Sequence, residues 1–242
     1  MTENTVDKEV VFNLNDTHPD WHLILKNALD SMDKNYLRAL SKDKTWLPGE
    51  ENIFNAFRLP LKNLKRILFG ESPYPRKISA NGYAFWDNAV GKLWSEKGLS
   101  KEVNRATSLR NFIKMLLSTE NKTTTSDKSD FIQTLPELFH HLLNHGFLLL
   151  NATLVYRQNK VREDAKYWQS FLKILLSEIY KIHPDTELIF LGNIAKQIDP
   201  LITDPYHKIY AEHPYNLSFI TNPVVLQYFG KFGLLRETQG LQ

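Results

Sequence analysis

The strongest constraint on the fold is a set of four short apolar runs that alternate with helical patterns. The runs occupy residues 65–70, 147–155, 187–192 and 208–214. The second run, FLLLNATLV, is apolar almost without a break, which is typical of a strand buried on both faces. Strands separated by helices favour a central, mostly parallel sheet. The sequence therefore predicts a single α/β domain built on four strands.

Helical patterns fill the segments between these runs, with apolar residues at three- and four-residue spacing. Helices are predicted over residues 21–40, 108–120, 134–146, 164–182, 193–198 and 222–235. Ser108 is predicted to cap the second of them, because serine at this position can accept hydrogen bonds from the first turn. Residues 1–18 are polar and are expected to be loose, which leaves 19–242 as the folded domain.

Composition narrows the class of protein. Hydrophobic residues make up 42% of the 242 residues and aromatic residues 12%, which is enough to bury a sizeable core. The absence of cysteine excludes disulfides, cysteine-ligated zinc and iron–sulfur clusters. No apolar run of about 20 residues predicts a membrane span, and the first ten residues lack the pattern of a secretory signal. We therefore expect a cytoplasmic protein, and its net charge of +3 permits nucleic-acid binding.

Chemically suggestive residues follow each predicted strand. The segments are 70–74 (GESPY), Asn151, 192–193 (GN) and 213–218 (HPYNLS). Ligands of parallel α/β sheets bind at the carboxyl ends of the strands. If the strands are parallel, these four segments converge on one edge of the sheet and form one site.

Several of these segments, in order, resemble the family-1 uracil-DNA glycosylases. LPGEENIFNAFRLPLKNLKRILFGESPYP is similar to the family's P-G-E-x-x-x-F-x-A-F segment, its first strand and the motif G-Q-D-P-Y-H. GYAFW resembles G-x-x-F-S, and GFLLLNATLVYR resembles G-V-L-L-L-N-x-x-L-T-V. AKYWQSF and HPYNLS are similar to G-W-x-x-F and H-P-S-P-L-S. The resemblance extends over residues 20–236, and the matches together are far more specific than any one alone.

The resemblance implies a three-layer α/β/α fold around the four-stranded sheet. It also implies a hydrolase that flips a pyrimidine-type base, uracil or a modified pyrimidine, out of DNA and cuts its N-glycosidic bond. Chemistry on a stacked base requires that extrusion. The base leaves as an anion and the sugar gains cationic character, so both charges need stabilisation and a water needs positioning. The implied chemistry needs no metal or cofactor. DNA is the expected partner, with no membrane, and the protein is expected to be a monomer.

The resemblance assigns roles to five residues around the base. Phe85 would stack on it, and Asn151 would read its edge, since an amide offers an acceptor and two donors. His213 would stabilise the negative charge on the departing base. Leu217 would fill the gap left in the duplex. Tyr74 would crowd the 5-position and reject thymine.

Further residues match DNA-backbone contacts. Gly192 and Asn193 correspond to the family's Gly-Ser loop, and Ser108 and Ser218 could contact phosphates through hydroxyl or backbone N–H groups. The letters DPYH also occur at residues 204–207, but they follow no apolar strand. We interpret that occurrence as a coincidence in the loop before the last strand.

The main departure from the family lies in the turn after the first strand. Ser72 stands where the family has an aspartate that orients water and stabilises the cationic sugar. Pro75 replaces the motif's histidine, a change that poxviral members share. Glu71 could compensate, because other branches of the superfamily carry G-E-x-P with a water-positioning glutamate. Adjacent residues of an extended segment point to opposite faces, so such a replacement requires the turn to redirect Glu71.

Three hypotheses follow. The first, which we favour, is an active DNA glycosylase with an altered pocket, in base excision repair or in defence against phage DNA that carries modified bases. The second is a catalytically impaired DNA-binding paralogue that acts as a damage sensor or replication accessory, which Ser72 favours. The third is a protein-interaction module on the same fold, against which salt-dependent DNA binding would count.

Overall fold

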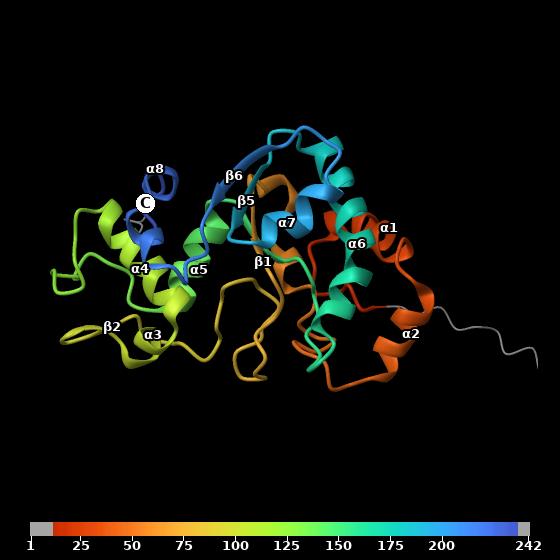
Figure 1. Ribbon diagram of the computed structural model, residues 1–242, viewed down its shortest axis with the longest axis horizontal. Helices are drawn as coiled ribbons and strands as arrows, with labels where there is room; N and C mark the ends of the chain where they lie inside the picture. The colour runs from red at the N-terminus through yellow and green to blue at the C-terminus, as the bar shows by residue number, and fades with distance from the viewer. Residues whose placement is uncertain (1–11, 237–242) are drawn as a thin grey trace, which may run out of the picture.

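A wholly parallel four-stranded sheet forms the centre of the molecule in the computed structural model, which describes residues 12–236 (Figure 1). Its strands, in the spatial order β4-β1-β5-β6, are Phe147–Asn151, Arg66–Gly70, Glu187–Leu191 and His207–Ala211. The parallel register confirms the predicted sheet. All four strands therefore present their carboxyl ends at one edge.

Helices cover both faces of the sheet, as the three-layer prediction requires. They are α1 His22–Asp30, α2 Lys34–Lys42, α3 Lys101–Arg105, α4 Thr107–Thr119, α5 Leu135–Asn144, α6 Val161–Ile182, α7 Ile194–Ile198 and α8 Pro223–Phe229. Short 3-10 turns occur at Pro19–Trp21, Asn55–Arg58, Leu61–Asn63, Asp199–Leu201 and Leu217–Thr221. In Figure 1, α1, α2 and α6 lie on one side of the sheet and α4, α5 and α8 on the other.

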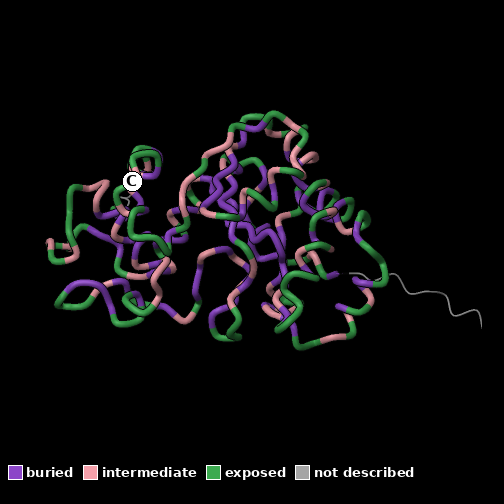
Figure 2. The backbone as a smooth tube through the Cα atoms, in the orientation of Figure 1, coloured by how far each residue is buried: buried purple, intermediate pink, exposed green. Residues whose placement is uncertain are grey.

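Two apolar cores lie on the two faces of the sheet. Ile67 and Phe69 of β1 pack with α1 and α6, whereas Leu68 between them packs with α4, α5 and α8. Alternate residues of a strand point to opposite faces, so one apolar run supplies both cores. In Figure 2, buried residues run along these strands at the centre of the molecule. This double burial fixes the register and with it the position of every strand end.

Several predicted boundaries differ from the structure. The first predicted helix is two helices, because Asp33 accepts a hydrogen bond from Tyr36 N and caps the start of α2. Ser108 is not a cap, since α4 begins at Thr107 and Ser108 lies within its first turn. The long apolar run ends as a strand at Asn151, which makes Asn151 the last residue of β4. Gly146, with φ of +77°, follows α5 as the predicted stop.

An unpredicted hairpin precedes α3. Its strands are β2 Trp94–Ser95 and β3 Gly98–Leu99, and they pair antiparallel. The N-terminal segment, residues 1–18, was expected to be loose. Its residues 1–11 lie outside the described part of the chain. In the remainder of that segment Phe12 is buried, edge-on to Phe54. Among residues 12–236, no helix has the length and hydropathy needed to cross a bilayer.

Candidate active site

A hollow of about 310 Å³ lies at the carboxyl ends of β1 and β5. Of the residues predicted from the sequence, four line it: Glu71 and Phe85 from the connection after β1, Asn193 from the turn after β5, and His213 from the loop after β6. Phe69, Gly70, Leu191, Ile194 and Tyr215 complete the wall. The predicted convergence of the strand ends is therefore present in the structure, whereas the roles of the individual side chains stay predictions.

Asn151 lies directly behind Gly70. The two residues pair in register at the ends of β4 and β1. A Cβ built on Gly70 would lie 2.5 Å from Asn151 Oδ1 and 2.8 Å from Ala84 Cβ, so only glycine fits there. Asn151 is 3% exposed, and its side chain makes no hydrogen bond to any residue of the described part of the chain. A buried amide without a protein partner is suited to bonding a ligand.

Phe85 is held in a conformation that non-glycine residues rarely adopt. Its φ is +62°, in the left-handed region. The Tyr74 hydroxyl donates a hydrogen bond to Phe85 O at 3.2 Å, and Ala84 N donates to Leu149 O at 3.1 Å. Burial raises the pKa of Tyr74, which keeps this hydroxyl protonated as a donor. Neighbouring contacts therefore maintain the strain, a condition that clusters at functional sites.

His213 has one ring nitrogen committed and one available. Tyr215 N donates a hydrogen bond to His213 Nδ1 at 3.1 Å, which places the proton of the neutral ring on Nε2. Burial lowers the pKa of His213, while the negative charge of Glu71 acts in the opposite direction. The Cβ of His213 packs against Gly192, where an added Cβ would approach it to 2.7 Å. A neutral imidazole with a free N–H can donate to an anionic oxygen.

Glu71 and Ser72 are placed differently. Glu71 lines the hollow, and its Oε1 accepts a hydrogen bond of 3.4 Å from Gln197 Nε2 on α7. Ser72 is half-buried and is not among the residues that line the hollow. The turn after β1 thus directs the carboxylate of this pair, rather than the hydroxyl, towards His213.

The remaining predicted residues lie around the rim. Tyr74 and Ser108 line the adjoining hollow, which has a volume of about 510 Å³. Leu217 is 71% exposed at the start of a short 3-10 turn, with Ser218 also exposed beside it. Gly192 has a φ of +84° in the turn after β5.

One positioning contact was not foreseen from the sequence. Asn111 on α4 is fully buried and donates through Nδ2 to Pro214 O at 2.8 Å and towards Tyr215 O at 3.3 Å. It fastens the loop that carries His213 and Leu217 to α4. The only signal in the sequence is an asparagine within an apolar helix face. The literal DPYH is unrelated to the site, since Tyr206 is buried and donates to Leu176 O.

No family model matches the chain. A uracil-DNA glycosylase of Campylobacter lari is 31% identical over 197 residues, which cover 78% of this chain and 75% of that protein. A uracil-DNA glycosylase of Campylobacter jejuni subsp. doylei is 28% identical over 217 residues, 86% of this chain and 85% of its own.

Solved structures agree with these relatives. The wild-type UNG crystal structure from Nitratifractor salsuginis superposes with a TM-score of 0.87 at 34% identity, covering 93% of this chain and 94% of that one. The mimivirus uracil-DNA glycosylase, at 19% identity and a TM-score of 0.56, shares the fold. By sequence and by structure, this chain belongs to the uracil-DNA glycosylase family.

Proposed function

We propose that this protein removes uracil from DNA through the hollow at the strand ends, as the first step of base excision. The observation that carries the proposal is the meeting of Glu71, Phe85 and His213 in one hollow, with the unpaired amide of Asn151 behind it. Family membership supplies the reaction, hydrolysis of an N-glycosidic bond in DNA. The geometry supports a distinct task for each side chain.

Recognition of the flipped base falls to Phe85 and Asn151. The ring of Phe85 stacks on the base, an interaction of about 1–3 kcal/mol. The amide of Asn151 accepts from N3–H and donates to O4 of uracil, so the base supplies hydrogen-bond partners that the described part of the protein does not. Tyr74, fixed by its bond to Phe85 O, limits the room for a substituent at the 5-position. That limit favours uracil over thymine and over 5-substituted pyrimidines of phage DNA.

Bond cleavage separates a negative base from a positive sugar. His213 Nε2–H donates to O2 of the departing base and stabilises its negative charge. Glu71 holds the attacking water and faces the cationic sugar, so it takes the part that the family assigns to the aspartate replaced by Ser72. Leu217 enters the duplex in place of the flipped nucleotide, while Ser108, Gly192, Asn193 and Ser218 contact the backbone phosphates.

A panel of labelled oligonucleotides tests this proposal. Single- and double-stranded substrates carrying uracil, thymine, cytosine or 5-substituted cytosines are incubated with the protein, and alkali then reveals abasic sites. Release of uracil is expected. Release of a 5-substituted base in preference to uracil would contradict the assigned role of Tyr74 and favour defence against modified DNA.

Two variants separate the candidate water-holding residues. Glu71→Gln keeps the size and hydrogen bonding of the side chain but removes its charge, and is expected to lower kcat about 100-fold. Ser72→Ala is expected to leave kcat within a few-fold of the wild type. A larger loss in Ser72→Ala than in Glu71→Gln would assign the water to Ser72 and overturn this part of the proposal.

The second candidate function is that of a DNA-binding paralogue with little catalysis, because Ser72 lacks the charge that the family uses. DNA binding without base release from any substrate of the panel would favour it. Binding to a duplex that contains an abasic site, with the dependence on salt expected for phosphate contacts, would then measure damage sensing.

A further inference from the structure

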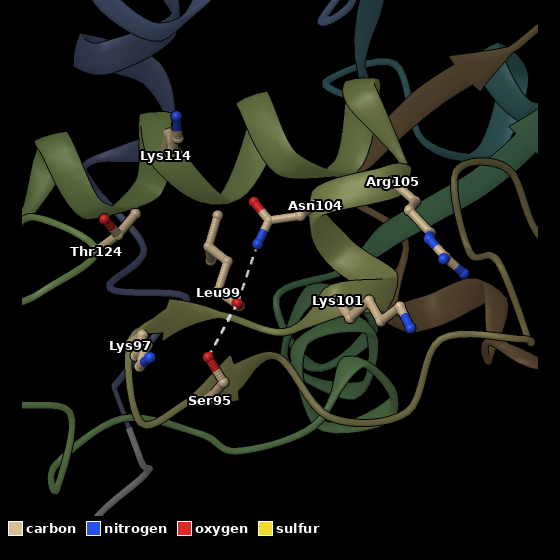
Figure 3. A pocket seen from close by; sticks show the side chains of 8 residues that line it. All are labelled: Ser95, Lys97, Leu99, Lys101, Asn104, Arg105, Lys114 and Thr124. Atoms are coloured by element: carbon tan, nitrogen blue, oxygen red, sulfur yellow. Dashed lines mark hydrogen bonds between the residues drawn. The ribbon is translucent and has the colours of Figure 1, made fainter.

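A second, strongly basic hollow lies outside the candidate active site, between the β2–β3 hairpin, α3 and α4 (Figure 3). Its volume is about 600 Å³, and it is open to solvent. Four cationic side chains line it, namely Lys97, Lys101, Arg105 and Lys114. No acidic residue lines it, and none of the four forms an ion pair within residues 12–236.

The cations stand on a well-anchored scaffold. Asn104 Nδ2 and Ser95 Oγ both donate to Leu99 O, at 3.0 and 3.2 Å, and join the hairpin to α3. Arg110 donates to Asn104 O at 3.0 Å and joins α3 to α4. The hairpin itself is fixed to the body by Trp94, whose indole N–H donates to Ile132 O at 2.7 Å. Four positive charges are thus held near one another, and none of them is ion-paired with an acidic side chain of the described chain.

A chain of neighbouring residues connects this hollow to the active site. Phe85 of the active site bonds to Tyr74, and Tyr74 lines the adjoining hollow together with Ser108. Arg105 lines both that adjoining hollow and the basic one. In Figure 3, Lys101 and Arg105, one turn apart on α3, extend in the same direction. The path therefore runs from Phe85 through Tyr74 and Ser108 to Arg105 and on to the lysines.

The charge changes along this path. The adjoining hollow contains Arg76 and Arg105 but also Asp87 and Glu102, and Arg76 is paired to Asp87 at 3.1 Å. The basic hollow has four cations and no acid. An open, extended surface with spread-out positive charge suits a polyanion rather than a small anionic ligand. DNA is such a polyanion, since each strand carries one negative charge about every 3.4 Å along its axis.

We propose that the hairpin, α3 and α4 form a secondary DNA-binding surface that holds the phosphate backbone of the duplex on one side of the flipped nucleotide. The inference rests on the proposed function, because it uses the active site to place the DNA. It adds Lys97, Lys101 and Lys114 to the residues that bind the substrate. These lysines hold the DNA without contacting the reacting base.

The test compares two double variants that remove the same charge. Lys97→Gln with Lys101→Gln changes the basic hollow. Lys62→Gln with Lys173→Gln changes two exposed lysines that form no ion pair in the described chain, and serves as the matched control. Each protein is assayed on duplexes with uracil flanked by about 5 or about 15 base pairs, the longer arms reaching roughly 50 Å from the uracil.

On the long duplex, the Lys97/Lys101 variant is expected to raise KM about tenfold at low salt and leave kcat unchanged. The slope of log affinity against log salt should fall in magnitude by about 2, one for each lysine that no longer binds a phosphate. The short duplex should show no change, and the control variant should match the wild type on both. With duplexes extended on only the 5′ or only the 3′ side of the uracil, the increase in KM should appear for one of the two and not for the other.

An equal KM for the two double variants on the long duplex would overturn the inference, as would an equal effect on the long and short duplexes. Direct binding by fluorescence anisotropy, with the same duplexes, measures the surface independently of cleavage. Failure of the wild type to release uracil would contradict the proposed function. A length-dependent loss of binding in the Lys97/Lys101 variant alone would still support the surface.

Discussion

Asp164, in the first turn of α6, and Asn151, at the end of β4, are both buried polar residues, but they differ in whether the protein supplies their hydrogen-bond partners. Asp164, with no exposed surface, accepts hydrogen bonds from Tyr36 and Arg157, and the Tyr36 hydroxyl in turn accepts from Trp168 Nε1 at 3.0 Å. Asn151, only 13 positions earlier, is nearly as buried and has no protein partner in the described chain. The first group is satisfied by the fold, whereas the second is available to a ligand.

The presence or absence of protein partners decides whether a substitution at these residues should affect stability or ligand binding. The ion pair and burial raise the pKa values of Arg157 and Tyr36 respectively, so both remain protonated donors to Asp164. Removing one partner from such a network leaves the others unpaired, which costs far more than the pair contributes. The Asn151 amide is bonded to no group of the described chain, so a ligand can bond it without breaking a hydrogen bond of the protein. Changes to the Asp164 network should therefore affect folding, and changes at the strand ends should affect chemistry.

The largest expected effect is on stability. Asp164→Ala should lower the free energy of unfolding by about 3–5 kcal/mol, because it removes the buried counter-charge of Arg157 and leaves only the exposed Glu163, at 4.0 Å. Chemical denaturation monitored by tryptophan fluorescence measures this loss. Asp164→Leu combined with Arg157→Met removes both charges and should recover most of it. Equal losses in the single and double variants would show that the network supports the fold through packing rather than through charge.

A slightly smaller effect is expected on catalysis. His213→Ala should lower kcat by about 10²- to 10³-fold, because it removes the proposed donor to the departing base. Its unfolding midpoint should stay close to that of the wild type, since the imidazole lies in an open hollow rather than in a satisfied network. Single-turnover release of uracil gives the rate. A His213→Ala protein that lost stability to the extent of Asp164→Ala would contradict the distinction between the two regions.

The left-handed backbone of Phe85 predicts which of two variants, Phe85→Gly or Phe85→Ala, is the more stable. At an ordinary position alanine is more stable than glycine, but at the left-handed φ of Phe85 glycine should be favoured by about 1 kcal/mol. Phe85→Gly should therefore unfold at a higher denaturant concentration than Phe85→Ala, although both lack the ring that we propose to stack on the base. The reverse order would mean that the backbone at Phe85 relaxes once the ring is removed.

The smallest expected effect concerns pH. Burial holds the pKa of His213 below its ordinary value of 6.5, so the ring stays neutral as the pH falls through 6.5. The kcat/KM for uracil release should accordingly change little from pH 8 to 6.5 and decline only below that. Glu71→Gln removes the charge that opposes this shift, so the decline in this variant should move to still lower pH. Movement to higher pH would show that Glu71 does not act on the imidazole.

The general fold could be predicted because short, contiguous segments of the sequence indicate each strand and helix. Each of the four apolar runs is long enough for one strand, and polar residues follow each run, so a parallel sheet places them together. The split of the first helix at Asp33 and the hairpin before α3 were missed. Two-residue strands carry too little periodicity to be recognised, and a single aspartate within an amphipathic pattern is compatible with either a cap or an exposed helix position.

The site could be predicted only in part. Which residues gather at the strand ends follows from the topology, but which side chain of a turn faces the hollow depends on backbone angles that no pattern reveals. That limit applies to the orientation of Glu71 relative to Ser72 and to the left-handed conformation of Phe85. The basic hollow was missed for a related reason, because Lys97 lies in the hairpin and Lys101 on α3, and neither element was predicted.

The bond from Asn111 to the backbone at Pro214 has a consequence for the thermodynamics of association. Ordering a free loop costs about 1–2 kcal/mol for each residue that is fixed. Because α4 already holds the segment from His213 to Leu217 in shape, that cost is borne during folding rather than at each encounter with DNA. A search along a genome consists of many brief encounters, and a loop ordered in advance allows each of them to test a base without first refolding.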